Sequence, residues 1–165
     1  MTDVRIRPAV DGDEHEIVAM VRELAEYERA ADLAIGTPEQ FREALFGDHP
    51  AVFANIAETS TGEIAGFALW FRNFSTWQGK HGVYLEDLYV RPEFRGLGIG
   101  QLLMAELAAV CEAEGYPRFE WWVLDWNESA RNVYNHLGAE ALTEWIPYRV
   151  SGVALTQLAA RASNP

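Results

Sequence analysis

The chain has 165 residues, of which 49% are hydrophobic and 23% charged, and this composition predicts a single globular domain over residues 1–165 rather than a disordered chain. The net charge of −12 argues against nucleic acid as a partner, because phosphate contacts need a basic surface, and it favours a cationic partner. The apolar runs fall far short of the ~20 residues of a membrane helix, the N-terminus lacks a signal-peptide pattern, and the single cysteine, Cys111, excludes an internal disulfide. We therefore expect a cytoplasmic protein with no nucleic-acid or membrane partner.

The first half of the chain predicts a strand, two helices and three more strands. Val4 to Arg7 forms the first expected strand, and apolar residues recur at helical spacing from Ile17 to Ala25. Asp11–Glu14 resembles a capping box, and Thr37–Gln40 is a second helix start with Thr as cap, Pro at the first helical position and Gln at the third. The later strands are expected at Ala51–Glu58, Glu63–Phe71 and Val83–Val90, with a polar segment, Asn73–Gly82, before the last one.

Acidic residues are concentrated in the helical part of this half. Residues 11–48 contain eleven acidic and three basic side chains and so carry −8 of the net −12. Solvated helix faces would account for most of these carboxylates. A few of them could instead line a site for a positively charged substrate.

The second half alternates helices and strands. A glycine-rich turn at Arg95–Gly100 precedes a long helix with an apolar face that includes Cys111, and Phe119–Leu124 is the next expected strand. Asn127 is the expected N-cap of a short helix that Gly138 ends. Two final strands are expected at about Ala139–Thr143 and Ile146–Val150. The order β-α-α-β-β-β-α-β-α-β-β predicts an α/β layered domain with a mixed sheet.

The glycine turn is the segment best suited to hold a ligand. Glycines let the backbone approach closely, and the following helix N-terminus offers free N–H groups that suit phosphate. The turn is not a Rossmann fingerprint, because Gln101 stands where Gly is required, and it is not a Walker loop, because Lys80 is the sole lysine. A tight turn that only packs strand against helix is the alternative.

Arg95-Gly96-Leu97-Gly98-Ile99-Gly100 matches the R/Q-x-x-G-x-G/A signature with which GNAT acetyltransferases bind acetyl-CoA. The chain resembles the diamine acetyltransferase branch of that superfamily, which acts on spermidine, spermine and thialysine. The other segments that carry the resemblance are Ile6-Arg7-Pro8-Ala9, Glu23–Glu28, Gly66-Phe67-Ala68, Tyr84-Leu85-Glu86-Asp87, Trp126-Asn127-Glu128 and Tyr134 with Gly138-Ala139. The resemblance covers nearly the whole chain. It implies a mixed, mostly antiparallel central sheet flanked by helices, acetyl-CoA as co-substrate, no metal, and a homodimer.

The resemblance also implies the reaction, which is acetyl transfer to a primary amine of a small diamine, polyamine or diamino acid by direct attack in a ternary complex. Its expected acetyl-CoA contacts are Leu88, Tyr89, Val90, Arg95, Gly96, Leu97, Gly98, Ile99, Gly100 and Gln101, with Asn127 and Tyr134 from the later helix. The N–H of Leu88 is expected to donate to the thioester oxygen and so stabilise the developing oxyanion. For Asn127, a plain helix cap fits the sequence equally well.

Tyr134 and Glu86 are expected to move protons. Tyr134 would protonate the departing thiolate, because a tyrosine of pKa ~10 stays protonated beside a thiolate of pKa ~8.5. Glu86 would accept a proton from the alkylammonium through water. Adjacent strand residues face opposite sides, so Glu86 and Asp87 are not expected to form a dyad. The alternatives are a core tyrosine and carboxylates paired with an arginine.

Glu28 and Asp87 are expected to hold the distal cationic group of the substrate, with Trp77 and Trp145 offering cation–π faces. Each tryptophan could equally be a half-buried loop aromatic. Ser75-Thr76 precedes Trp77, where polyamine-acetylating members carry an aspartate, and this difference favours a short diamine or a diamino acid over spermine.

Other side chains show no competing chemistry. The four histidines, His15, His49, His81 and His136, lack metal-ligand spacing, and Cys111 is expected to be a buried structural thiol. Two alternative functions stay open: acetylation of protein or peptide amines, and a non-catalytic regulator that binds acetyl-CoA.

Overall fold

The computed structural model describes residues 3–163, so residues 1–2 and 164–165 of the predicted domain lie outside it. The described chain divides into two compact units, Met1–Leu124 and Asp125–Pro165, each of which is described by itself. The first unit contains a five-stranded sheet in the order β1-β2-β3-β4-β5. Its strands are β1 (Val4–Pro8), β2 (Phe53–Thr59), β3 (Ile64–Ser75), β4 (Lys80–Val90) and β5 (Phe119–Trp121). Only β5 runs parallel to its neighbour, which confirms the predicted mixed, mostly antiparallel sheet.

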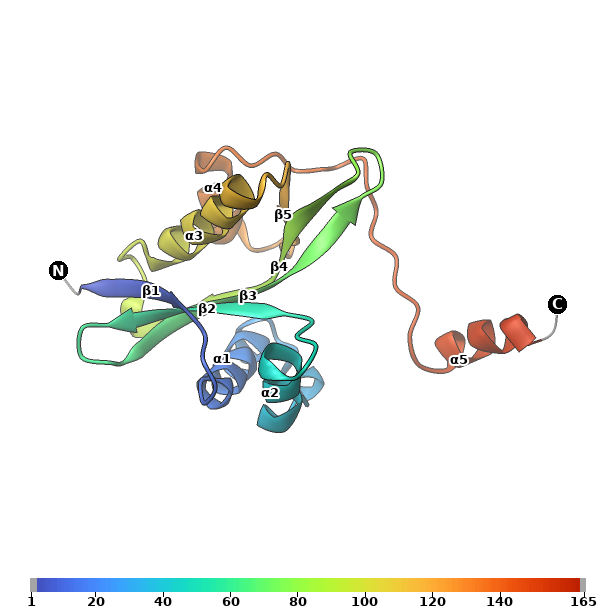
Figure 1. The fold of residues 1–165 in the computed structure, drawn as a ribbon, viewed down its shortest axis with the longest axis horizontal. Coiled ribbons are helices and arrows are strands. Elements are labelled where there is room, and N and C mark those ends of the chain that lie inside the picture. Colours follow the sequence, from blue (N-terminus) through green and yellow to red (C-terminus); the bar gives the residue numbers. More distant parts are fainter. Residues whose placement is uncertain (1–2, 164–165) are drawn as a thin grey trace. The chain divides into compact units, whose positions relative to one another are not determined.

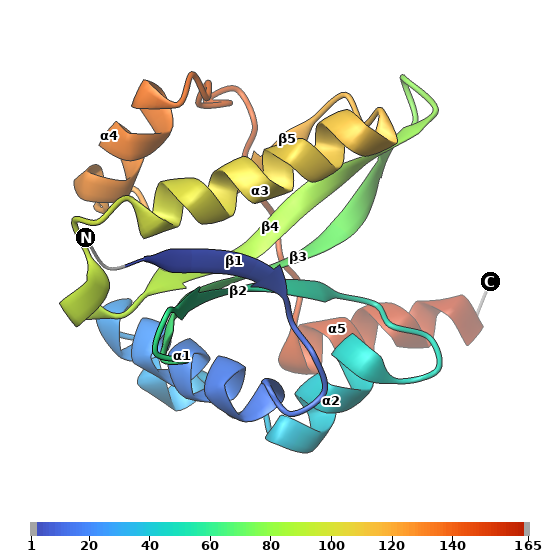
Figure 2. The ribbon, with the colours of Figure 1, turned by 60° about the vertical axis from the view of Figure 1, so that its left-hand side comes forward.

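Helices cover both faces of this sheet (Figures 1 and 2). Helices α1 (Glu14–Tyr27) and α2 (Pro38–Phe46) lie on one face, and α3 (Ile99–Glu114) lies on the other. Short 3₁₀ segments at Ala31–Leu33 and Pro92–Phe94 follow α1 and precede α3. The unit is therefore a layered α/β structure, as the order of elements predicts.

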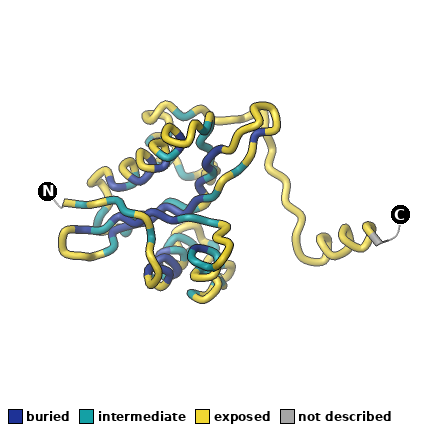
Figure 3. The backbone as a smooth tube through the Cα atoms, in the orientation of Figure 1, coloured by how far each residue is buried: buried dark blue, intermediate teal, exposed yellow. Residues whose placement is uncertain are grey.

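Burial is concentrated in the sheet and on the helix faces that pack against it (Figure 3). Ile17 and Met20 of α1 pack with Phe67 and Leu69 of β3 in one core cluster. On the opposite face, the apolar stripe of α3 is buried at Ile99, Leu103, Met104, Leu107 and Cys111, which confirms the predicted buried thiol. Burying each such side chain contributes roughly 1.5–3 kcal/mol, so both layers hold the sheet firmly.

The two predicted helix starts have different outcomes. At α2 the prediction is confirmed, because Thr37 accepts from the Gln40 N–H while the Gln40 side chain accepts from the Thr37 N–H. At α1 the predicted capping box is wrong, because the helix begins at Glu14 and the Asp11 carboxylate accepts from the Arg42 guanidinium at 2.6 and 3.0 Å. A charge-assisted, two-point hydrogen bond to an arginine is stronger than a cap bond.

The segment predicted as polar connection, Asn73–Gly82, is mostly strand. β3 continues to Ser75 and β4 begins at Lys80, so only a short turn separates them. Phe74 and His81 face each other across the ladder with ring centroids 5.2 Å apart, and this pair stabilises the extension. Alternation of apolar residues does not predict this extension, because Phe74 and His81 belong to different strands and their pairing is not visible in either stretch of sequence alone.

The second unit contains α4 (Glu128–His136) and α5 (Gly152–Ala160), with a 3₁₀ segment at Arg161–Ser163. The two strands predicted at 139–143 and 146–150 are wrong, because those residues form no strand in the structure. A strand needs a ladder partner, and alternation of apolar residues alone does not supply one. Helix α5 is rich in Ala and Leu, which favour helix, but it lacks the amphipathic period that would have predicted it. No helix within residues 3–163 combines the length and apolarity needed to cross a membrane.

Candidate active site

The glycine turn between β4 and α3 has the geometry of an anion site. Gly96 and Gly98 have φ of +77° and +78°, a region that side chains rarely adopt, and Gly98 is the N-cap of α3. No atom of the described residues lies within 4 Å of where a Cβ would stand at either glycine. Gly98 has no capping side chain, so the first N–H groups of α3 have no intrahelical or side-chain partner. The turn can therefore accept phosphate oxygens on its backbone.

The end of β4 beside this turn has one unpaired edge. β4 pairs with β5 only from Val83↔Phe119 to Leu85↔Trp121, whereas its pairing with β3 continues to Val90↔Gly66. In the described residues, Leu88, Tyr89 and Val90 thus have a strand partner on the β3 side alone. The Val90 carbonyl accepts from Arg95 Nε, and the backbone groups of Leu88 on the side away from β3 are available to a ligand, as the expected pantetheine contact requires.

A β-bulge interrupts β4 at Glu86. Trp70 lies opposite Leu85 and Leu69 opposite Asp87, which leaves Glu86 as the extra residue. Asp87 therefore shares a face with Leu69, which packs in the cluster beneath α1 and α2. The bulge shifts the side-chain period of β4 by one residue, so Asp87 does not share the face of Leu85 as regular alternation would require. That Glu86 and Asp87 form no dyad stays a prediction.

Carboxylates from two elements meet at this bulge. Burial first, and then the negative charges of Glu86 and Glu28, together raise the pKa of Asp87 to about 6. Partial burial also raises the pKa of Glu28, which directly follows α1. The structure thus brings three of the predicted residues together: Glu28, Glu86 and Asp87. A cation placed among them would relieve both the desolvation and the repulsion.

An aromatic pair lies next to the carboxylates. Tyr84, opposite Phe71 on β3, packs on it with ring centroids 5.0 Å apart and meets the Trp122 ring edge-on at 6.2 Å. Burial raises the pKa of Tyr84, and the charges of Glu86 and Glu120 raise it further. The hydroxyl therefore stays protonated close to the acidic group.

The side chain of Arg95 makes contacts that the sequence did not predict. Its Nε donates to the carbonyl of Val90 at 2.9 Å, and its guanidinium lies 5.3 Å from the ring centroid of Tyr27 and 5.5 Å from that of Tyr89. Nothing in the motif indicates these partners, because they come from α1 and β4.

Arg91 is a second arginine that sequence analysis missed. It donates to Glu16 at 2.8 Å, to Glu23 at 3.3 Å and to the carbonyl of Ile64 at 3.0 Å. Glu16 and Glu23 lie seven residues apart on one face of α1, and this spacing was the available signal for a basic partner. These bonds tie α1 to the ends of β3 and β4.

Three predicted residues lie in the second unit. Asn127 Oδ1 accepts from the Ala130 N–H at 3.2 Å, so its capping role is confirmed. Tyr134 is half-buried on α4, and Trp145 is exposed on the irregular segment that follows. Their roles in catalysis and substrate binding stay predictions.

Trp77 is not brought to the carboxylates within the first unit. It lies in the turn of the β3–β4 hairpin and is 93% exposed. Along β4, Lys80 and Glu86 are separated by roughly 20 Å at the rise of an extended strand. A cation–π role for Trp77 at this cluster has no support from the fold of the unit.

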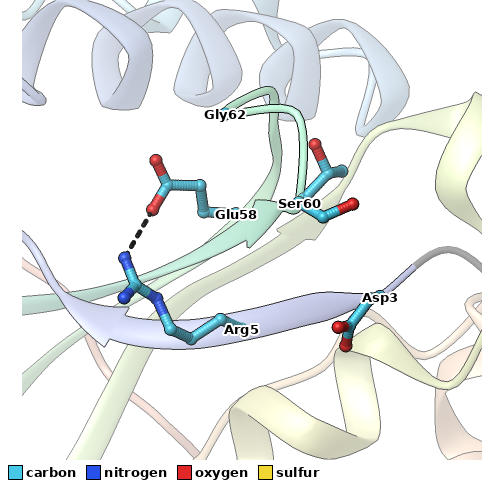
Figure 4. A pocket seen from close by; sticks show the side chains of 6 residues that line it. Asp3, Arg5, Glu58, Ser60 and Gly62 are labelled. Carbon is cyan, nitrogen blue, oxygen red and sulfur yellow. Dashed lines mark hydrogen bonds and ion pairs between the residues drawn. The ribbon is translucent and has the colours of Figure 1, made fainter.

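A separate hollow lies at the edge of the sheet between β1 and the β2–β3 turn (Figure 4). It is lined by Asp3, Arg5, Glu58, Ser60 and Gly62, and Arg5 forms an ion pair with Glu58 at 3.1 Å. None of the predicted site residues lines it. The Glu58 carboxylate in this hollow already forms ion pairs with Arg5 and Arg7, so we interpret the hollow as part of a structural ion-pair cluster.

Known proteins share these features. Residues 17–139 match the acetyltransferase (GNAT) family. The chain is 40% identical over 171 residues to the thialysine N-epsilon-acetyltransferase of Sus scrofa, with 98% of this chain and 100% of that protein covered. It is 40% identical over 92 residues to an L-ornithine N5-acetyltransferase of Arabidopsis thaliana, over 56% of this chain and 40% of that protein. A solved integron cassette protein from V. cholerae superposes with a TM-score of 0.77 at 28% identity, over 96% of this chain and 98% of that one.

The family match includes the glycine turn, the bulged strand and the carboxylates described above. The full-length similarity to a named acetyltransferase agrees with that match. Fold, turn geometry and sequence similarity lead to one conclusion: the chain belongs to the GNAT family and is an acetyl-transferring enzyme.

Proposed function

We propose that the enzyme transfers an acetyl group from acetyl-CoA to the primary amine of a small diamine, polyamine or diamino acid. The observation that carries this proposal is the meeting of Glu28, Glu86 and Asp87 at the bulge of β4. The negative charges of Glu86 and Glu28 raise the pKa of Asp87, so this group forms a site that a cationic substrate stabilises. The net charge of −12 supports the same substrate class.

GNAT acetyltransferases use acetyl-CoA as co-substrate, and the geometry of this chain fits that molecule. The positive-φ glycines and the N-terminus of α3 would hold its pyrophosphate. The unpaired edge of Leu88–Val90 would accept the pantetheine arm. The residues assigned to it are Leu88, Tyr89, Val90, Arg95, Gly96, Leu97, Gly98, Ile99, Gly100 and Gln101, with Asn127 and Tyr134.

In this proposal the amine attacks the thioester directly. Glu86, exposed at the bulge, takes the ammonium proton through water, because an alkylammonium of pKa ~10 cannot attack until it is deprotonated. The N–H of Leu88 donates to the thioester oxygen as charge develops on it. Tyr134 gives its proton to the departing thiolate.

Within this class we favour a diamino acid or a short diamine. Ser75-Thr76 lacks the additional carboxylate that a long polycation would use. The names of the relatives, which act on thialysine and L-ornithine, point the same way. Both are small molecules with a primary amine at the end of a short chain.

The test is release of free thiol from acetyl-CoA with a panel of amines: putrescine, spermidine, spermine, lysine, thialysine, ornithine and a basic peptide. Amine-dependent release with a small diamine or diamino acid is the expected result. Preference for the peptide would move the substrate to protein amines, and binding of acetyl-CoA without turnover on any amine would contradict an enzyme of this class.

A matched pair of variants assigns the carboxylates. Glu28→Gln is expected to raise the KM of the amine about tenfold, because one charged contact is removed, and to leave the KM of acetyl-CoA nearly unchanged. Glu26→Gln removes the same charge from an exposed position on α1 and is the control. Equal effects of the two substitutions would show that only the overall charge matters.

We further propose that residues 1–165 act as one catalytic domain in a cytoplasmic homodimer. Support comes from the apolar side chains that the second unit exposes, among them Val153, Leu155 and Leu158 of α5. Light scattering after size exclusion is expected to give twice the chain mass of 18.5 kDa. A mass of one chain at micromolar concentration would refute the dimer.

A further inference from the structure

The side chain of Arg95 joins three segments that belong to both proposed substrate sites. Its backbone lies in the glycine turn, its Nε donates to Val90 at 2.9 Å, and its guanidinium lies over the ring of Tyr89 on β4. The guanidinium also lies 5.3 Å from the ring centroid of Tyr27, the last residue of α1. The next residue along the chain is Glu28 of the carboxylate cluster.

Tyr89 connects this arrangement to α1 a second time. Burial raises the pKa of Tyr89, and the charge of Glu23 and a hydrogen bond to it raise it further, whereas Arg95 lowers it. Glu23 also accepts from Arg91 at 3.3 Å. The C-terminal half of α1 is thus held to the end of β4 by two arginines, Arg91 and Arg95, of the segment between β4 and α3.

The weakness of the contacts of Arg95 with Tyr27 and Tyr89 indicates that they position the turn and α1 and contribute little to the stability of the fold. Arg95 is exposed and Tyr27 is 42% exposed, so each cation–π contact changes a local equilibrium only about two- to fivefold. That is small beside the stability of a domain. A two- to fivefold change is nevertheless enough to bias how the turn and the end of α1 are positioned relative to each other.

We propose that the Arg95 side chain, held between Tyr27 and Tyr89, is a positioning residue that couples the acetyl-CoA turn to the amine site. A bound nucleotide fixes the turn, the turn fixes Arg95, and Arg95 fixes the end of α1 that carries Glu28. Acetyl-CoA then raises the affinity for the amine, and the amine raises the affinity for acetyl-CoA by the same factor. This inference rests on the proposed function.

The test measures amine binding by calorimetry with and without coenzyme A, which occupies the nucleotide site without reacting. Putrescine, ornithine and thialysine are the amine probes. In the unaltered enzyme, coenzyme A is expected to tighten binding of the best probe about fivefold or more. In Tyr27→Leu and in Arg95→Gln, the factor is expected to fall below about twofold. Gln is the alternative residue of the signature, so the backbone of the turn is kept.

Two controls separate coupling from general damage. Tyr27→Phe keeps the ring and is expected to retain the coupling. Tyr116→Leu removes a tyrosine just beyond the C-terminal end of α3, about 24 Å along the helix from the glycine turn, and is expected to change neither affinity nor coupling. Steady-state kinetics of Tyr27→Leu should show raised KM values for both substrates with a nearly unchanged kcat.

The outcomes are distinct. Coupling that persists in both Tyr27→Leu and Arg95→Gln, or that is lost equally in Tyr116→Leu, overturns the inference while the proposed function stands. Loss of coupling in Tyr27→Phe as well would assign it to the hydroxyl and contradict the role of the ring. If none of the three amines binds to the unaltered enzyme or is acetylated by it, the proposed function fails first.

Discussion

Single residues at this site are governed by what surrounds them. In a regular strand Asp87 would share the face of Leu85, but the bulge at Glu86 turns it toward the α1 face, where burial and two carboxylates raise its pKa to about 6. Gly98 likewise owes its importance to one backbone angle, φ +78°, at the start of α3. In both cases the residue type is visible in the sequence, but its chemical state follows from its neighbours.

The raised pKa of Asp87 predicts a pH-dependent stability. The folded protein binds this proton more tightly than the unfolded chain, whose aspartate has a pKa near 3.9, so its stabilising contribution is present below pH ~4 and is lost as the pH rises through about 6. Asp87→Asn is expected to raise the free energy of unfolding by up to about 3 kcal/mol at pH 8 and by little at pH 4. Urea titrations at both pH values measure this, and an equal effect at both would contradict the assignment. The KM of the Asp87→Asn variant for the amine is expected to rise at pH 8.

Gly98→Ala tests the backbone of the glycine turn. A side chain at φ +78° costs about 1–2 kcal/mol, and relaxing it rotates the N–H groups away from the anion. The KM of acetyl-CoA is expected to rise about tenfold or more, with a much smaller change for the amine. Gly115→Ala, at φ +65° beyond the C-terminal end of α3, imposes similar strain about 24 Å along the helix from the glycine turn and is the control. A similar rise of this KM in the control would refute the assignment.

Helices and strands were predicted where their signals are local. The capping box Thr37–Gln40 and the alternation of β2 and β3 depend on residues close in sequence, and both appear in the structure. Elements whose form depends on a distant partner were missed or wrong. Asp11 forms no capping box because its carboxylate accepts from Arg42, and residues 139–150 form no strand.

Thr37→Ala tests the contribution of the capping box. The substitution removes the side-chain acceptor for the Gln40 N–H and is expected to lower the free energy of unfolding by about 1 kcal/mol. Thr143→Ala is a control at an exposed position in a turn outside any helix. Thermal unfolding of the two variants gives the comparison, and no difference between them would show that the box contributes nothing. Activity at 25 °C should stay unchanged in Thr37→Ala, since α2 carries no proposed site residue.

The charge of the whole molecule acts on both substrates in opposite senses. With a net charge of −12, the protein attracts a cationic amine and repels the anionic nucleotide through long-range forces that salt screens. Much of the acidic excess lies in residues 11–48, the segment that contains α1 and α2 and covers the face bearing Asp87. The electrostatic field of the whole protein and the carboxylates Glu28, Glu86 and Asp87 therefore both favour a cationic substrate.

Ionic strength tests this at the scale of the molecule. Raising NaCl from 0.05 to 0.5 M is expected to raise the KM of putrescine several-fold, because screening removes most of the attraction. The KM of acetyl-CoA should stay constant or fall. Initial rates of thiol release at fixed pH measure both, with sodium acetate replacing NaCl to exclude a specific chloride effect. An amine KM that is independent of salt would refute electrostatic attraction.

The sequence by itself determined the glycine turn, most strands of the sheet, the α3 core face and the family, because these depend on contiguous residues and on short periods. It also named Glu28, Glu86 and Asp87 through resemblance. Only the tertiary structure decided how these carboxylates come together. The bulge in β4 changes the face on which Asp87 lies, and Glu28 at the end of α1 lies close enough for its charge to act on Asp87. Arg91 and Arg95 then hold α1 to the end of β4. The physical reason is range, since a capping bond or a glycine φ is fixed within a few residues, whereas burial and charge repulsion arise between segments far apart in the chain.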